Sequence, residues 1–185
     1  MSSGSDVGER HGVPYDTGGL AAAVADARRG SEDAFRTLYR ALYSPLLGYL
    51  TARLGRDEAT AAATAVWQEI AQGVFSFHGD GTDFRVWVMS LARRQVEDHP
   101  QQVRPAGTDT DDLRRALTAL PSDLSEALLL REVVRLDDAA AARVLGTTAV
   151  SARAAADRAA WLVADCLASR PEPGGPRTEL ACAWC

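Results

Sequence analysis

The segment 136–162 places the tightest limit on the fold, because it combines two helical runs with a glycine between them. The first run, 136–145, reads LDDAAAARVL and is followed by Gly146, which predicts a turn. The two threonines after the glycine can cap a second helix that begins near Ala149. Ala142 lies four positions before the glycine, and so small a side chain lets the two helices cross closely. The segment is therefore predicted to form a helix-turn-helix.

The rest of the chain also shows the periodicity of helices. Apolar residues recur at helical spacing, and no stretch shows the sustained alternation that is typical of strands. We expect further helices near 20–24, 35–50, 57–72, 84–99, 113–120 and 121–134. Pro45 should kink a helix or mark a helix start, Asp83 should cap the helix from 84, and 75–82 should form a loop. The predicted fold class is all-α.

Composition divides the chain into five parts. Residues 1–17 are rich in Ser, Gly and charge, and predict a disordered arm. The stretch 101–110 is polar and contains Pro and Gly, which indicates a flexible linker. Several prolines and glycines in 169–185 prevent regular structure and predict a disordered tail. We therefore expect two small helical domains, at 18–100 and 111–168.

The charge balance opposes unaided binding to nucleic acid. The chain has a net charge of −5 and a pI of about 5.2, although all 20 basic side chains are arginines. The second helix of the helix-turn-helix offers only Arg153 and Arg158, with Asp157 between them. If the protein meets DNA, we expect another molecule to deliver it there.

Several other classes of protein fit the sequence poorly. No stretch approaches the roughly 20 apolar residues that span a membrane, and the first residues do not resemble a secretion signal, so we expect a cytoplasmic protein. Cys182 and Cys185 have the spacing of metal or redox motifs, but too few further ligands accompany them for zinc, and reduced thiols in a tail fit better. The other candidate metal groups are His78 with Asp80 and Asp83, and the run 97–99 (EDH), whose adjacent residues on a helix point in different directions. We expect no metal, no cofactor and no enzyme activity.

Three motifs occur in a fixed order along the chain. They are RGSEDAFRTLY at 29–39, FRVWVMSLARR at 84–94 followed by DH at 98–99, and the set ALP at 119–121, LLLR at 128–131 and VLG at 144–146. In order and spacing they resemble the extracytoplasmic-function (ECF) class of RNA polymerase sigma factors. The resemblance implies a sigma domain two at 18–100 and a sigma domain four, with its helix-turn-helix, at 111–168. It also implies core RNA polymerase as partner and promoter DNA bound as part of the holoenzyme, and it allows an anti-sigma factor.

The resemblance assigns two sets of site residues. Polymerase would be bound by Glu58, Thr64, Trp67 and Glu69, and DNA by Arg85, Arg93, Arg94, Arg143, Ser151, Arg153 and Arg158. Arg93 and Arg94 also fit a solvated helix face, and Trp67 and Trp161 fit either the core or an interface. The chain departs from the family at 60–65, which reads TAAATA where acids and a glutamine are usual, and at 154–160, which is mostly alanine where basic residues are usual.

Two functions follow from this reading. The first is transcription initiation of the sigma type, in which the protein binds core polymerase and directs it to a promoter. The alternative is a degenerate sigma-like regulator that acts by binding an anti-sigma factor, polymerase or another regulator without reading promoters. The divergent positions at 60–65 and 154–160 favour the alternative, whereas the order of the motifs favours initiation.

Overall fold

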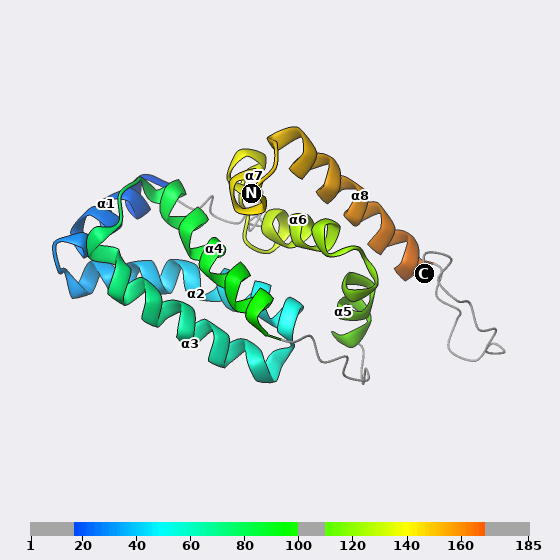
Figure 1. Ribbon diagram of the computed structural model, residues 1–185, viewed down its shortest axis with the longest axis horizontal. Coiled ribbons are helices and arrows are strands. Elements are labelled where there is room, and N and C mark those ends of the chain that lie inside the picture. The colour runs from blue at the N-terminus through cyan, green and yellow to red at the C-terminus, as the bar shows by residue number, and fades with distance from the viewer. Residues whose placement is uncertain (1–16, 100–109, 169–185) are drawn as a thin grey trace, which may run out of the picture.

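A computed structural model describes residues 17–99 and 110–168, and within these ranges the chain is all-helical (Figure 1). The elements are α1 (Thr17–Arg28), α2 (Glu32–Leu54), α3 (Arg56–Gly73), the 3₁₀ helix η1 (Val74–Ser76), α4 (Gly81–Asp98), α5 (Thr110–Ala119), α6 (Ser122–Glu132), α7 (Asp138–Leu145) and α8 (Ala149–Ala168). The described part contains no strand, which confirms the predicted fold class. The predicted linker and tail, with Cys182 and Cys185, lie outside the described residues apart from the first residue of α5.

The helices form two units, α1–α4 and α5–α8, which occupy the two halves of Figure 1. These units are not separate, because α4 packs against α7, and α2 packs against α5 and α6. The buried apolar residues of both units belong to one continuous cluster, in which Leu50, Phe84, Leu130 and Val144 are all buried. The sequence predicted two domains and did not predict this contact between them.

Helix α2 is longer than the sequence suggested and continues through Pro45. Ser31 caps it by accepting a hydrogen bond from the backbone N–H of Ala34 at 3.3 Å. Pro45 lies inside the helix and does not mark its start, although proline removes one backbone donor. Leu42, Leu46 and Tyr49 are buried on either side of the proline, so tertiary packing holds the helix through it.

The start of α4 differs from the prediction by a few residues. Asp80, not Asp83, is the N-cap, because its side chain accepts from the Asp83 N–H at 2.8 Å. The Asp83 carboxylate accepts in return from the Asp80 N–H at 2.9 Å, which completes a capping box. The loop predicted at 75–82 is correspondingly shorter, since η1 extends to Ser76 and α4 begins at Gly81.

The helix-turn-helix forms as predicted between α7 and α8. Asp137 caps α7 through the Ala140 N–H at 2.7 Å, and Gly146 ends it in a left-handed conformation with φ 68°. The Thr148 hydroxyl then accepts from the Ser151 N–H at 3.1 Å at the start of α8. Ala142 is buried, as the close helix crossing requires.

Candidate nucleic-acid and polymerase interface

Arg85 was predicted to contact DNA, and the structure instead places it in the seam between the two units. Its side chain is buried, and its guanidinium donates to the carbonyl oxygens of Val134 at 2.5 Å and Arg135 at 2.9 Å. These carbonyls belong to the irregular segment after α6, where backbone acceptors have no partners from a helix and must find others when buried. A cationic side chain from the other unit satisfies them. In this arrangement Arg85 is buried and its donors are occupied, and its assignment to DNA stays a prediction.

Arg93 is half-buried in the same seam. One terminal nitrogen donates to the carbonyl oxygen of Val144 at 3.0 Å, in the last turn of α7. Its Nε lies 3.0 Å from Glu97 Oε1 and 3.3 Å from Glu126 Oε1, ion-pair distances without the alignment of a hydrogen bond. Arg93 is thus held between its own helix and the second unit in this arrangement, and its assignment to DNA stays a prediction.

Arg143 reaches across the seam from the opposite side. It lies 2.7 Å from Asp83 Oδ1, which joins α7 to the first turn of α4. The hydrogen bond from the Asp80 backbone N–H, and after it the Arg143 guanidinium, hold the pKa of Asp83 below its ordinary value of 3.8. Asp83 therefore stays ionised at neutral pH and remains an anionic partner for Arg143.

Arg94 and Glu69, assigned to different partners by the sequence, form an ion pair with each other. Arg94 projects from α4 to the Glu69 carboxylate on α3, and Gln95 donates to the other oxygen of Glu69 at 3.1 Å. Arg94 is exposed and Glu69 is half-buried. The pair lies within the first unit, so it does not depend on the contact between the units.

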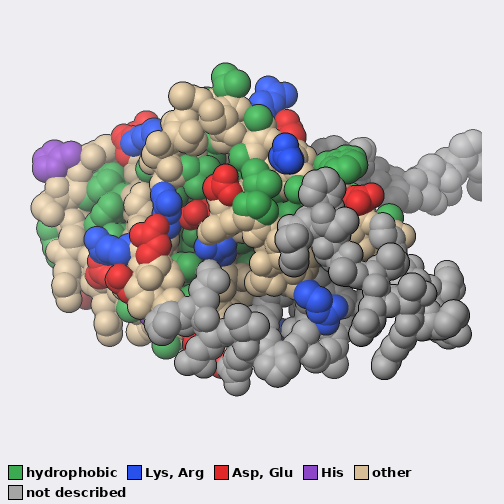
Figure 2. All heavy atoms as spheres, turned by 45° about the vertical axis from the view of Figure 1, so that its right-hand side comes forward, with side chains coloured by type: hydrophobic (Ala, Val, Ile, Leu, Met, Phe, Trp, Pro, Cys, Tyr) green, Lys and Arg blue, Asp and Glu red, His purple; other side chains and the backbone are tan. Residues whose placement is uncertain are grey.

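The outward side of α8 carries the remaining predicted DNA contacts. Arg153 and Arg158 are both exposed. The Arg153 guanidinium lies 4.0 Å from the carboxylates of Asp138 and Asp157. No ion pair among the described residues involves Arg158. Val150 and Trp161 are 79 % and 61 % exposed, which places Trp161 at a surface and not in the core. On the face shown in Figure 2, basic and acidic side chains are interspersed, and no broad basic surface is visible among the described residues.

The predicted polymerase-binding residues on α3 have unequal access to solvent. Glu58 is half-buried, and Thr64 is exposed, with its hydroxyl donating to the Thr60 carbonyl at 2.9 Å. Trp67 is buried, and its ring lies against Phe35 and Tyr39, with centroids 5.9 Å and 4.8 Å away. Of the two roles open to Trp67, the structure gives it the core.

The aromatic group on α2 is a surface feature that the sequence analysis missed. Tyr39 is 39 % exposed, stacks on Tyr43 with centroids 4.8 Å apart, and covers Trp67. The spacing of Phe35, Tyr39 and Tyr43, four residues apart, was the available signal, because such residues share one helix face. Tyr39 presents this face to solvent beside α3.

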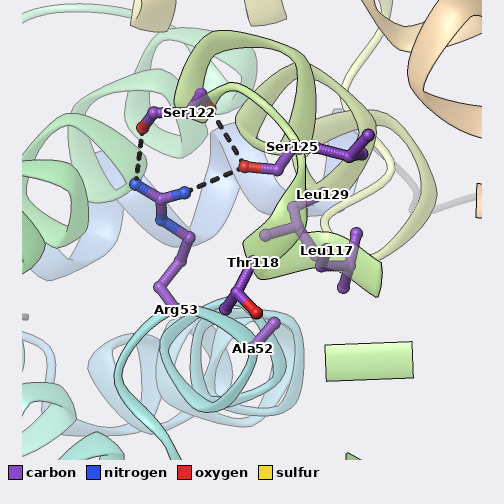
Figure 3. A pocket seen from close by; sticks show the side chains of 8 residues that line it. Ala52, Arg53, Leu117, Thr118, Ser122, Ser125 and Leu129 are labelled. Carbon is purple, nitrogen blue, oxygen red and sulfur yellow. Dashed lines mark hydrogen bonds between the residues drawn. The ribbon is translucent and has the colours of Figure 1, made fainter. Parts of the chain in front are cut away.

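The seam also contains a small cavity of about 70 Å³ between α2, α5 and α6 (Figure 3). Arg53 donates there to the hydroxyls of Ser122 at 2.9 Å and Ser125 at 3.0 Å. A space of this size suits a few water molecules and is too small for a cofactor.

The described residues contain no group of three or more side chains able to hold a metal ion, and His78 instead bonds the Ser76 carbonyl at 2.7 Å. None of the described helices is long and apolar enough to cross a bilayer.

Comparison with known proteins supports the fold. No family model and no curated protein sequence matches the chain. Among solved structures, it is similar to CnrH in complex with the cytosolic domain of CnrY, with 18 % identity, a TM-score of 0.70, and coverage of 83 % of this chain and 99 % of that chain. It also matches a chain of the RsbN–BldN complex, with 25 % identity, a TM-score of 0.38, and coverage of 77 % and 97 %. At its identity the first likeness establishes a shared two-unit helical fold.

Proposed function

We infer that the protein is a transcription initiation factor of the sigma type, which binds core RNA polymerase and directs it to promoter DNA. The observation that carries this inference is the capped helix-turn-helix α7–α8, joined to a four-helix unit in the order that the sequence motifs imply. The fold shared with CnrH over almost the whole of that chain supports the same order of elements. The sigma-factor resemblance of the motifs supplies the function that this fold serves.

In this function α8 is the helix that meets DNA. Its N-terminal turn presents Ser151 and Arg153, which are exposed, and the following turns present Arg158. The first unit contributes Arg94 from α4 toward the promoter, and exposed residues of α3, such as Thr64, toward polymerase. The net charge of −5 is compatible with this role, because polymerase supplies most phosphate contacts in a holoenzyme.

A second function, regulation by protein–protein binding without promoter recognition, is favoured by one observation. The outward side of α8 carries Val150 and Trp161 together with only two arginines, and this composition suits an apolar partner better than a phosphate backbone. CnrH, which shares the fold, was solved with a protein domain bound to it. An anti-sigma factor is the corresponding partner for this chain.

In vitro transcription distinguishes the two functions. Core polymerase transcribes the organism's own fragmented genomic DNA with and without the protein, and the 5′ ends of the transcripts are sequenced. Initiation predicts a defined set of start sites that depend on the protein. Replacing both Arg153 and Arg158 by alanine should weaken these sites. The control is Arg29→Ala, which should leave them unchanged, because Arg29 is an exposed arginine of the first unit that pairs with Asp26 of the same unit. If the protein adds no start sites, the inference of initiation is wrong and the second function remains.

A further inference from the structure

We propose that the seam between the two helical units is an autoinhibitory latch, which must open before the arginines within it can contact DNA. The proposal rests on the proposed function for its biological meaning, because it concerns regulation of the same surfaces. Its structural part, a reversible contact that occupies these arginines, can be tested without polymerase. The latch is defined here as Tyr49, Arg93 and Glu126 with the arginine contacts that surround them.

The centre of the latch is a buried carboxylate. Glu126 on α6 is 4 % exposed, and its Oε1 accepts from the Tyr49 hydroxyl on α2 at 2.9 Å. Arg93 on α4 brings a positive charge to within 3.3 Å of the same oxygen. Burial and the neighbouring carboxylate raise the pKa of Tyr49 far above its ordinary value, so the phenol remains a donor at any physiological pH.

A contact centred on a buried charge is suited to reversible closure. Desolvation of the Glu126 carboxylate offsets much of its attraction to Arg93, and water restores that solvation when the units separate. The contact between the units combines this polar centre with apolar residues of the shared cluster, and such mixed interfaces within a chain resemble transient interfaces between proteins. Four arginine contacts surround the centre: Arg85 with the Val134 and Arg135 carbonyls, Arg93 with the Val144 carbonyl, Arg143 with Asp83, and Arg53 with Ser122 and Ser125.

The latch occupies three of the residues that the sequence assigned to DNA. Arg85, Arg93 and Arg143 each direct guanidinium nitrogens to an acceptor on the opposite unit. A guanidinium held in this way cannot grip a phosphate or a guanine edge through the same nitrogens. Separation of the units releases all three side chains together, whereas Arg94, Arg153 and Arg158 are unaffected by it.

An engineered disulfide across the seam can hold the latch closed. A Cβ atom built at Gly48 on α2 lies 3.0 Å from Cγ1 of Val133, just after α6. Since Cγ1 is one bond from the Val133 Cβ, the two Cβ positions are at most about 4.5 Å apart, which a disulfide can bridge. Gly48→Cys with Val133→Cys is therefore made in a chain whose three native cysteines are replaced by serine. Mild oxidation should cross-link it within the monomer, and a reductant should reverse the link.

Binding to a short fluorescent DNA duplex of arbitrary sequence, measured across a range of salt concentrations, reports on the hidden arginines. Glu126→Ala in the same background, reduced, should open the latch. Each added phosphate contact steepens the dependence of the logarithm of the affinity on the logarithm of salt by about 0.9, so three released arginines should steepen it by about 2 to 3 relative to the oxidised chain. Oxidation of the Glu126→Ala chain carrying the same two cysteines should restore the shallower dependence. Recovery of the shallower salt dependence after this oxidation would show that Glu126→Ala separates the two units and does not unfold the chain.

Two results overturn the latch. One is the absence of a cross-link under oxidising conditions, and the other is an equal salt dependence for the locked and opened chains. Transcription from genomic fragments then tests its consequence, since the oxidised chain should initiate at least tenfold less than the same chain after reduction. If neither form initiates while the salt dependence shifts as expected, the proposed function is wrong and the latch stands.

Discussion

Tyr49→Phe tests the energetics of the buried centre most directly, because it removes one oxygen atom and leaves the ring in place. Tyr49 is fully buried, and its hydroxyl lies 2.9 Å from the Glu126 carboxylate. A hydrogen bond to a charged group contributes about 1.5–3 kcal/mol, and its loss here leaves a buried carboxylate with a poorly aligned arginine. We expect the free energy of unfolding to fall by about 2 kcal/mol and the Tm by about 4–8 °C.

Urea unfolding followed by circular dichroism measures this change, with Tyr43→Phe as the matched control. Tyr43 is half-buried and stacks on Tyr39, so removal of its hydroxyl keeps the ring contact and should change stability by less than about 0.5 kcal/mol. A Tyr49→Phe protein that lies within the same limit would refute the argument that this hydrogen bond stabilises the seam.

The pH dependence supplies an independent check on the same substitution. The pKa of Tyr49 is raised in the folded state, so its contribution is fully present below the unfolded value of 10.0 and is lost as the pH rises above it. The stability difference between the native chain and Tyr49→Phe should therefore be constant from neutral pH to about pH 9 and shrink above pH 10. A difference that stays constant above pH 10 would show that the pKa is not raised.

Three further predictions concern the end of α7, the surface of α8 and the ion pair between Arg143 and Asp83. Gly146→Ala should lower the free energy of unfolding by about 1 kcal/mol in thermal or urea unfolding, because φ is 68° there and nothing lies within 4 Å of an added Cβ; an unchanged stability would contradict the left-handed cap. Trp161→Ala should leave stability within about 0.5 kcal/mol, since the ring is 61 % exposed, and a larger loss would place it in a core. Carboxyl titration by NMR should give Asp83 a pKa below 3.8. Arg143→Ala should raise the pKa of Asp83 only in part, because the hydrogen bond from the Asp80 backbone N–H is the larger cause of the lowering. An unchanged pKa of Asp83 in that variant would mean that Arg143 does not reach across the seam.

The helices could be predicted from the sequence because their signals are local. Ser31, Gly146 and Thr148 each act within four residues of their own position, and apolar periodicity marks the buried face of every long helix. The start of α4 was missed by three residues because both Asp80 and Asp83 are good capping residues, and only their geometry shows which of them is the N-cap.

The environment of the arginines could not be predicted in the same way. Arg85 lies beside Phe84 on a helix with ordinary amphipathic spacing, and the carbonyls that bury it come from residues 49 and 50 positions further along the chain. The only local indication of the seam in the sequence was Glu126, which lies beside the apolar run ALLL at 127–130. An acidic side chain among core residues must find a hydrogen-bond or ion-pair partner there. Its partner Tyr49 lies 77 positions away and was not among the candidate residues.

The all-arginine composition gains a physical meaning from the seam. Arg85 bonds two successive carbonyls beyond α6, and Arg93 combines a carbonyl at the end of α7 with two carboxylates. A planar guanidinium has donors in fixed directions for such contacts, whereas a lysine ammonium is a point charge that could not span them. The same donor geometry is what phosphate and guanine recognition requires. Under the proposed latch, the side chains that hold the seam closed have the donor geometry that DNA binding would require, so closure would compete with binding for the same guanidinium nitrogens.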